Sequence, residues 1–294
     1  MHLMSRRLLA PLLSLFSAFS WANTDCAPAA SDCVEVGKWQ ISVALGAGVR
    51  TNPVMTNKDI PLIVLPEVHY QGERFFVQNL DFGAIVWEND QQQLNVLITP
   101  GYDQVFFHRW SPGNFIVDSR LMTTTPAYGE QFAPNKSLEA ARAVDMSRLH
   151  KRRMAALAGF EYSVIWQDWF VQSHWLYDVS KVHGGQELRL ALTRQFSHGK
   201  HSTALTAGGQ WQSGKMTDYY YGIRPEEVNF ADDAYRADSG LSAMIRADWQ
   251  YPLNDRWTLR ANASYKRLAS GIRQSPIVTS DHVTTVFVGG VYHF

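Results

Sequence analysis

A single antiparallel transmembrane β-barrel of about twelve strands is the fold that the sequence predicts, and three observations indicate it. Apolar and polar residues alternate at period two in runs of roughly ten residues, the length that a membrane-spanning strand needs. Beyond the first 22 residues no apolar run of 18 residues occurs, so a membrane helix is not available there. The chain also ends in an alternating segment that closes with an aromatic residue, Phe294.

Composition excludes two other classes of protein. The chain has 294 residues, with 27 Lys and Arg against 27 Asp and Glu. Binding of nucleic acid by bulk charge needs a basic surplus, which is absent, so we expect no nucleic-acid partner. The 10 Trp, 12 Tyr and 15 Phe are far more aromatic surface than a disordered chain carries. The chain is therefore expected to fold.

The first element, residues 1–22, has the pattern of a secretory signal peptide. Arg6 and Arg7 give the positive start, residues 8–19 are apolar, and Ser20-Trp21-Ala22 offers a cleavage site after Ala22. A membrane anchor is the alternative, but these 12 apolar residues fall short of the ~20 that a spanning helix needs. The sequence therefore predicts an exported protein.

Residues 23–37 are expected to form a periplasmic N-terminal segment ahead of a barrel domain at 38–294. This segment carries Cys26 and Cys33, the only two cysteines of the chain. In an exported protein an isolated pair is most simply one disulfide that closes a small loop. A metal site would need further ligands nearby, and the polar residues before Cys26 do not resemble the apolar residues that precede a lipidated cysteine.

The alternating runs place twelve strands along the barrel domain, the weakest of them within 74–107, where the alternation breaks. They are expected at 38–50, 61–71, 74–80, 82–89, 93–107, 149–162, 165–180, 187–196, 202–212, 239–251, 256–268 and 281–294. A soluble sandwich is the alternative, but its strands would be shorter and its turns more frequent. The expected periplasmic connections are short, whereas the long ones, at 51–60, 108–148, 213–238 and 269–280, fall on the outer side, as in bacterial barrels.

Aromatic residues gather toward the ends of these strands. They are Trp39, Trp169, Trp249, Tyr251, Trp257, Tyr265 and Tyr292. Such positions are typical of the aromatic girdles that lie at the two headgroup levels of a membrane barrel.

The last strand resembles the C-terminal signal by which outer-membrane barrels are recognised for insertion. Counting back from Phe294, the residues Tyr292, Val288 and Val286 share its face. A soluble chain that happens to end in Phe would account for the last residue but not for the alternation before it. We therefore interpret these four residues as an insertion signal.

Four stretches together resemble the MltA-interacting protein (MipA/OmpV) family of outer-membrane proteins. The stretches are Gly46 to Arg50, Pro61 to Val77, Tyr220 to Glu227, and Tyr265 to Val278. The last two contain the loop motif residues Tyr221, Gly222, Pro225, Ser275 and Pro276. The resemblance implies a barrel in the outer membrane of a Gram-negative bacterium, without a cofactor. It also implies a scaffold that binds a lytic transglycosylase and a bifunctional peptidoglycan synthase. The chain departs from the family pattern in its cysteine pair and at 51–59.

Charged residues on the expected lumen faces predict a mostly filled lumen. Arg50, Arg189, Arg246, Arg260 and Lys266 are expected to point inward with Glu187 and Asp248, a mixed set with a basic tilt. In a barrel narrower than the 16- to 18-stranded porins, such charges would pair across the interior. The alternative is that they solvate a narrow water channel.

Three other polar clusters are candidates for a catalytic, a metal-binding or a phosphate-binding site. His174 and Asp178 share a strand face with Ser180 and His183 beyond them, which allows a surface hydrolase, although polar residues are expected on a lumen face in any case. The turn at 198–201 lacks the partners of a metal site. Basic residues around the loop 108–148 suit the phosphates of lipopolysaccharide, or are simply solvated.

The function predicted from these observations is a non-enzymatic scaffold in the outer membrane, in contact with lipid and lipopolysaccharide. A narrow channel for small solutes is the second hypothesis, and a surface hydrolase is the third.

Overall fold

Twelve strands form one closed antiparallel barrel in the computed structural model, which describes residues 36–55, 58–108 and 148–294. Each strand pairs with its neighbours along the chain, and β1 pairs with β12 to close the ring. The strands are β1 (Trp39–Arg50), β2 (Ile60–Gln71), β3 (Phe75–Gln78), β4 (Asp81–Glu88), β5 (Gln92–Pro100), β6 (Ala156–Trp166), β7 (Trp169–Asp178), β8 (Gln186–His198), β9 (His201–Gln212), β10 (Gly240–Pro252), β11 (Trp257–Arg267) and β12 (His282–His293). The fold class predicted from the alternation is confirmed.

Short helical segments interrupt the long connections between strands. They are the 3-10 helix η1 (Tyr102–Phe106), helix α2 (Gly214–Tyr221), the 3-10 helices η4 (Pro225–Glu227) and η5 (Ala231–Asp233), and helix α3 (Ser270–Arg273). None of the helices in the described ranges has the length and apolar character needed to cross a bilayer. The expected signal peptide and the pair Cys26 and Cys33 lie outside the described residues.

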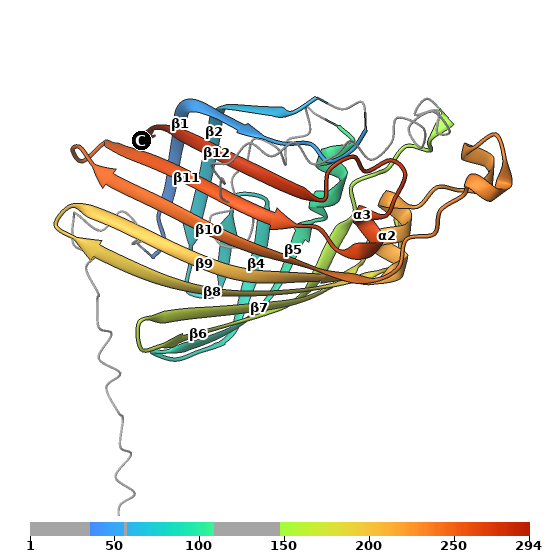
Figure 1. The fold of residues 1–294 in the computed structure, drawn as a ribbon. Helices are drawn as coiled ribbons and strands as arrows, with labels where there is room; N and C mark the ends of the chain where they lie inside the picture. Colours follow the sequence, from blue (N-terminus) through green and yellow to red (C-terminus); the bar gives the residue numbers. More distant parts are fainter. Residues whose placement is uncertain (1–35, 56–57, 109–147) are drawn as a thin grey trace, which may run out of the picture.

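The two ends of the barrel differ. At one end, called the turn end here, lie the short hairpin turns and the last residue, Phe294, on the left of Figure 1. The other end, called the loop end, carries the long connections together with α2 and α3 on the right of the same view. Connections are therefore short on one side and long on the other, as the sequence predicted.

The barrel is inverted relative to a soluble protein, because its apolar side chains face outward. On β1 the side chains of Ile41, Leu45 and Val49 are 40% to 48% exposed, whereas Ser42 between them is buried. The same pattern recurs on β8, where Leu188 and Leu190 are exposed and Arg189 is buried. An apolar outer surface with a polar interior is stable where lipid, rather than water, surrounds the wall.

Aromatic side chains form a girdle at the turn end. Trp39 lies 4.9 Å from Tyr70, measured between ring centroids, and Trp257 lies 5.1 Å from Tyr292. The ring of Tyr292 also meets the terminal ring of Phe294 edge-on. The residues proposed as an insertion signal lie on β12 and just after it, where Val288 and Phe294 are exposed on the outer face.

Several predicted strand limits were wrong: the strand expected at 149–162 runs on to Trp166, and the one expected at 165–180 begins at Trp169. The two largest errors lie where the chain leaves the wall at the loop end. The strand expected at 93–107 ends at Pro100, because the following residues turn inward as η1. Val105 and Phe106 are consecutive and both buried, which a strand with alternating faces does not allow. The strand expected at 149–162 begins only at Ala156, because the residues before it pack against the loop end.

Strand β3 is unusually short, with four residues between β2 and β4. Asn79 ends it in the left-handed region at φ 55°, and its side-chain oxygen accepts the backbone N–H of Val68 on β2. Pairing between β2 and β3 runs only from His69 to Gln71. Residues 60–67 of β2 therefore extend toward the loop end beyond the tip of β3, which leaves a step in the wall of the barrel.

The seam between β1 and β12 depends on two facing glycines, and a larger side chain there is expected to open it. A Cβ atom on Gly46 would lie 2.2 Å from the Val288 carbonyl oxygen and 2.6 Å from the Cα of Gly289. We expect Gly46→Val to lower the denaturant midpoint of the purified barrel, at a cost of roughly 1–3 kcal/mol for overpacking. Tryptophan fluorescence in detergent measures the midpoint. Ala47→Val, on the exposed face of the same strand, is the control and leaves the midpoint unchanged.

Candidate functional site

The loop end of the lumen is filled by a plug of apolar side chains. The segments η1, α2 and α3 carry it, together with the chain that follows α3. Tyr220, Tyr221 and Ile277 have no exposed surface, and Val105 and Ile272 are almost completely buried. These residues come from connections far apart in the sequence, so the plug forms only when the barrel brings the loops together.

The loop motif 220–227 builds one side of this plug. Tyr221 donates from its hydroxyl to Oδ1 of Asp103 on η1 at 2.7 Å. The next residue, Gly222, has no room for a side chain, because a Cβ atom there would lie 2.3 Å from the Asp218 carbonyl oxygen. Its own carbonyl oxygen accepts from Nη2 of Arg152 at 2.9 Å. The glycine is therefore needed for the close return of the chain after α2.

The second family-like stretch meets the first one inside the plug. Ser275, which follows α3, donates from its hydroxyl to the Tyr221 carbonyl oxygen at 2.6 Å. The next residue but one, Ile277, accepts a backbone hydrogen bond from Met55 in the connection between β1 and β2. Two motifs that lie about fifty residues apart in the sequence thus share one interface.

A carboxylate, Glu227, clamps the outside of the plug. It has no exposed surface and accepts from Nη1 of Arg152 at 3.0 Å and from the backbone N–H groups of His150 and Arg224. Pro225 begins the short helix η4 that presents it. Burial raises the pKa of Glu227, but the hydrogen bonds from Arg152 and from the two backbone groups outweigh burial and lower the pKa to about 2.

A row of polar side chains crosses the lumen wall beneath the plug. Asn95, Glu161, His174, Arg189 and Gln210 lie directly opposite one another on successive strands from β5 to β9. Asn95 donates to Glu161 at 2.9 Å, and Nε2 of His174 lies 2.7 Å from the other oxygen of that carboxylate. With Glu187 and Lys266, these residues are called the polar belt.

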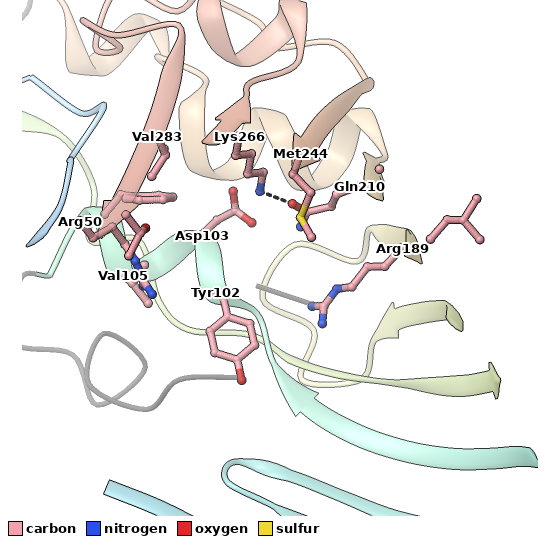
Figure 2. A pocket seen from close by; sticks show the side chains of 13 residues that line it. Arg50, Tyr102, Asp103, Val105, Arg189, Gln210, Met244, Lys266 and Val283 are labelled. Carbon is pink, nitrogen blue, oxygen red and sulfur yellow. Dashed lines mark hydrogen bonds between the residues drawn. The ribbon is translucent and has the colours of Figure 1, made fainter. Parts of the chain in front are cut away.

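The other half of the polar belt joins three strands. Arg189 pairs with Glu187, which also accepts from Gln210 at 2.8 Å. The Lys266 ammonium donates to the Gln210 side-chain oxygen, and Figure 2 shows this bond beside Asp103 of the plug. A small cavity of about 60 Å³ lies here between η1 and the wall. Polar groups therefore surround the inner surface of the plug.

A larger cavity of about 640 Å³ extends from the polar belt to the turn end, and we call it the vestibule. Arg50 and Thr285 line both cavities. Two ion pairs face the vestibule: Arg260 pairs with Glu67, and Arg246 pairs with Asp248. Because Glu67 is on β2 and Arg260 is on β11, their pair crosses the inner face of β1 and β12, the two strands between them, where the barrel closes.

The described residues of the lumen carry charges of both signs, without the basic tilt that the sequence suggested. The six cationic and acidic positions proposed from sequence lie inside the barrel, at Arg50, Arg189, Arg246, Asp248, Arg260 and Lys266. Sequence reasoning missed Glu67, Asp81, Asp103 and Glu161 as inward carboxylates. Among the described residues they make, with Glu187 and Asp248, six acids against five bases. The exposed neighbours Phe160 and Tyr162 were the signal that could have identified Glu161.

The residues that the sequence suggested for a hydrolase site lie in two different places. His174 faces the lumen and contacts Glu161. Asp178, at the end of β7, instead caps the following turn: it accepts from the Ser180 hydroxyl at 2.6 Å and from the backbone N–H of His183. The Ser180 hydroxyl thus contacts a carboxylate, which is the geometry of a capped turn. In the described part of the chain no group of three metal-binding side chains occurs.

The basic residues considered for lipopolysaccharide fall into two groups. The loop between 109 and 147 lies outside the described residues. Arg152 is buried in its pair with Glu227 and is not available to an external phosphate, whereas Lys151 and Arg153 are exposed at the loop end.

Comparison with known proteins identifies relatives over nearly the whole barrel. The family described as MltA-interacting protein MipA matches residues 43–294. The MltA-interacting protein of Escherichia coli K12 is 21% identical over 256 residues, 87% of this chain and 90% of that protein. The outer membrane protein Omp26La of Vibrio anguillarum is 27% identical over 146 residues, 50% of this chain. That match spans 57% of Omp26La, little more than half its length.

Among solved structures, the toluene transporter TodX of Pseudomonas putida is similar in part. It is 9% identical with a TM-score of 0.35, and the likeness covers 87% of this chain and 89% of that one.

Proposed function

Because the chain belongs to the MltA-interacting protein MipA family, we propose that it is a non-enzymatic outer-membrane scaffold that holds a lytic transglycosylase at its periplasmic face. The protein lies in the outer membrane, where the names of the relatives Omp26La and OmpV also place them. In outer-membrane barrels the short turns face the periplasm. The turn end is therefore the side that a cell-wall enzyme reaches.

The observation that carries the proposal is the plug. Among the described residues it fills the loop end of the lumen with buried side chains, which favours a closed barrel over an open channel. A narrow channel would require the plug to move. A barrel that is closed toward the outside and accessible at its turn end suits a role in positioning periplasmic proteins. A bifunctional peptidoglycan synthase is the second partner that we propose on the family resemblance.

The turn end also has a surface suited to a charged partner. Its charged residues include five acids, Glu73, Glu88, Asp90, Asp168 and Asp255, and five bases, Lys38, Arg74, Arg194, Lys200 and Arg256. Exposed charges contribute mainly to the rate and the salt dependence of association. Three of the acids, Glu73, Glu88 and Asp90, lie at two neighbouring turns, where the only base named above is Arg74. We propose that a basic surface of the partner meets these turns, and the complex is expected to weaken as salt rises.

A binding experiment tests the scaffold role. The detergent-purified protein is immobilised, and the lytic transglycosylase of the same cell is passed over it at several salt concentrations. We expect binding that weakens severalfold in the triple variant Glu73→Gln, Glu88→Gln and Asp90→Asn, because each exposed pair contributes roughly 0.2–1 kcal/mol. Glu226→Gln, an exposed change at the loop end, is the matched control and leaves binding unchanged. No binding above that of an unrelated barrel would remove the proposal.

A further inference from the structure

The step between β2 and β3 makes a notch in the barrel wall. Beyond Val68, no described strand pairs with the free edge of β2, which runs through residues 60–67. Pro66 lies on this segment and has no N–H to offer a neighbouring strand, as is usual for a proline on a sheet edge. An open strand edge is costly in lipid, because hydrocarbon cannot hydrogen-bond to it. The notch is thus an unusual feature that needs an explanation.

Behind the notch the lumen wall is apolar. A cluster of buried apolar side chains on the inner faces of β1, β2 and β12 includes Leu62, Leu65 and Phe287, which line the vestibule. We call this cluster the apolar strip; its members are Ala44, Ile60, Leu62, Leu65, Phe287 and Val291. The notch begins where β3 ends, beside Leu65 and Glu67 on β2 and Gln78 on β3. All three residues line the vestibule.

The vestibule therefore has an apolar strip behind the notch, with charged pairs beside it. These pairs carry both signs: Arg246 pairs with Asp248, and Arg260 pairs with Glu67 at the edge of the strip. Arg260 donates to Glu67 through Nη1, and a guanidinium has further N–H donors for a second oxygen. Guanidinium groups fit phosphate oxygens, and carboxylates fit an ammonium group. A head group that combines phosphate with ammonium matches both members of these pairs.

We propose that the vestibule binds one zwitterionic phospholipid with a phosphate and a primary ammonium in its head group. The head group lies at the two ion pairs, and an acyl chain follows the apolar strip and leaves through the notch into the membrane. The cavity of about 640 Å³ is within the range of 300–1,000 Å³ that is typical of sites for small molecules. The acyl chain covers the apolar side of the site at the edge of β2.

Photo-crosslinking tests this site directly. The purified protein is reconstituted with phosphatidylethanolamine that carries a diazirine on one acyl chain, and the adducts are located by mass spectrometry. We expect adducts on the inward residues Leu62, Leu65 and Phe287. The outward residues Ile63, Val64 and Val288 are labelled by bulk lipid in any case. Adducts confined to those outward residues would overturn the proposal without any variant being made.

Two further arms test recognition of the head group. Phosphatidylglycerol with the same diazirine chain, which lacks the ammonium, is expected to label the inward residues several times less; equal labelling contradicts the proposal. Arg260→Gln is expected to reduce inward labelling roughly tenfold, because it removes a charge-assisted hydrogen bond of about 1.5–3 kcal/mol. Arg256→Gln, in the exposed turn before β11, is the matched control and labels like the parent. Transglycosylase binding is measured separately, so failure of either proposal is distinguishable.

Discussion

A barrel that carries alanine at both Tyr220 and Tyr221 is expected to conduct ions in planar bilayers, whereas the parent protein is expected to be silent. Both side chains are fully buried at the centre of the plug. Removing a buried aromatic side chain costs roughly 3–5 kcal/mol. Helix α2 has only eight residues, too few to persist without its packing. The plug is therefore expected to detach while the strands keep their own hydrogen bonds.

The path opened in this way would run the length of the lumen. The cavity under the plug and the vestibule already share Arg50 and Thr285, and among the described residues it is the plug that lies between them and the loop end. Because the described lumen carries acids and bases in nearly equal number, six against five, little selectivity between anions and cations is expected.

Phe230→Ala is the control for this experiment. Phe230 belongs to the same connection between β9 and β10 but is 72% exposed, so its loss leaves the plug intact and the barrel silent. Steps of equal size in the parent protein would show that the plug does not seal the lumen. A silent double variant that still migrates as a folded barrel on gels would show that the seal lies elsewhere.

The outward faces of the barrel were predictable because lipid imposes a period of two on any strand that crosses it. β11 illustrates this: Leu259 is exposed between the inward residues Thr258 and Arg260, in agreement with the alternation. The rule applies only where a strand continues, so it gave the wrong end for the strand before η1. Asp103 was assigned to that strand, and its place in the plug was missed.

The plug could not be predicted from the periodicity of the sequence, because its packing joins residues that lie far apart along the chain. Ser275 meets Tyr221, and Arg152 meets Glu227, through loops that show neither a strand nor a helix pattern. The resemblance to the family drew attention to Tyr221, Gly222, Pro225 and Ser275 but did not place them. The step at β3 has a local cause that was visible in the broken alternation near Asn79, although its consequence for the wall required the register of β2.

The clamp at Glu227 predicts that the plug loosens in acid. The pKa of this carboxylate is about 2 in the folded protein, below its ordinary value of 4.5. A group with a lowered folded pKa contributes stability above the unfolded value and loses it as the pH falls. We therefore expect the contribution, roughly 3 kcal/mol, to be complete above about pH 4.5 and to be lost as the pH falls toward 2. Hydrogen exchange at residues 148–155 and 222–228, corrected for intrinsic rates, measures the loosening.

Glu227→Gln tests whether the clamp depends on the negative charge of this side chain, because glutamine has nearly the same size and shape but no charge. The variant leaves Arg152, which is almost fully buried, without its carboxylate partner, a change that typically costs about 3–5 kcal/mol. We expect fast exchange in both segments already at neutral pH, and an exchange profile that no longer depends on pH below 4.5. Glu226→Gln changes the adjacent exposed carboxylate and keeps the acid dependence of the parent. If Glu227→Gln instead retained protection at neutral pH, the backbone N–H groups of His150 and Arg224 would hold the loop without the ion pair, because a glutamine oxygen still accepts from them.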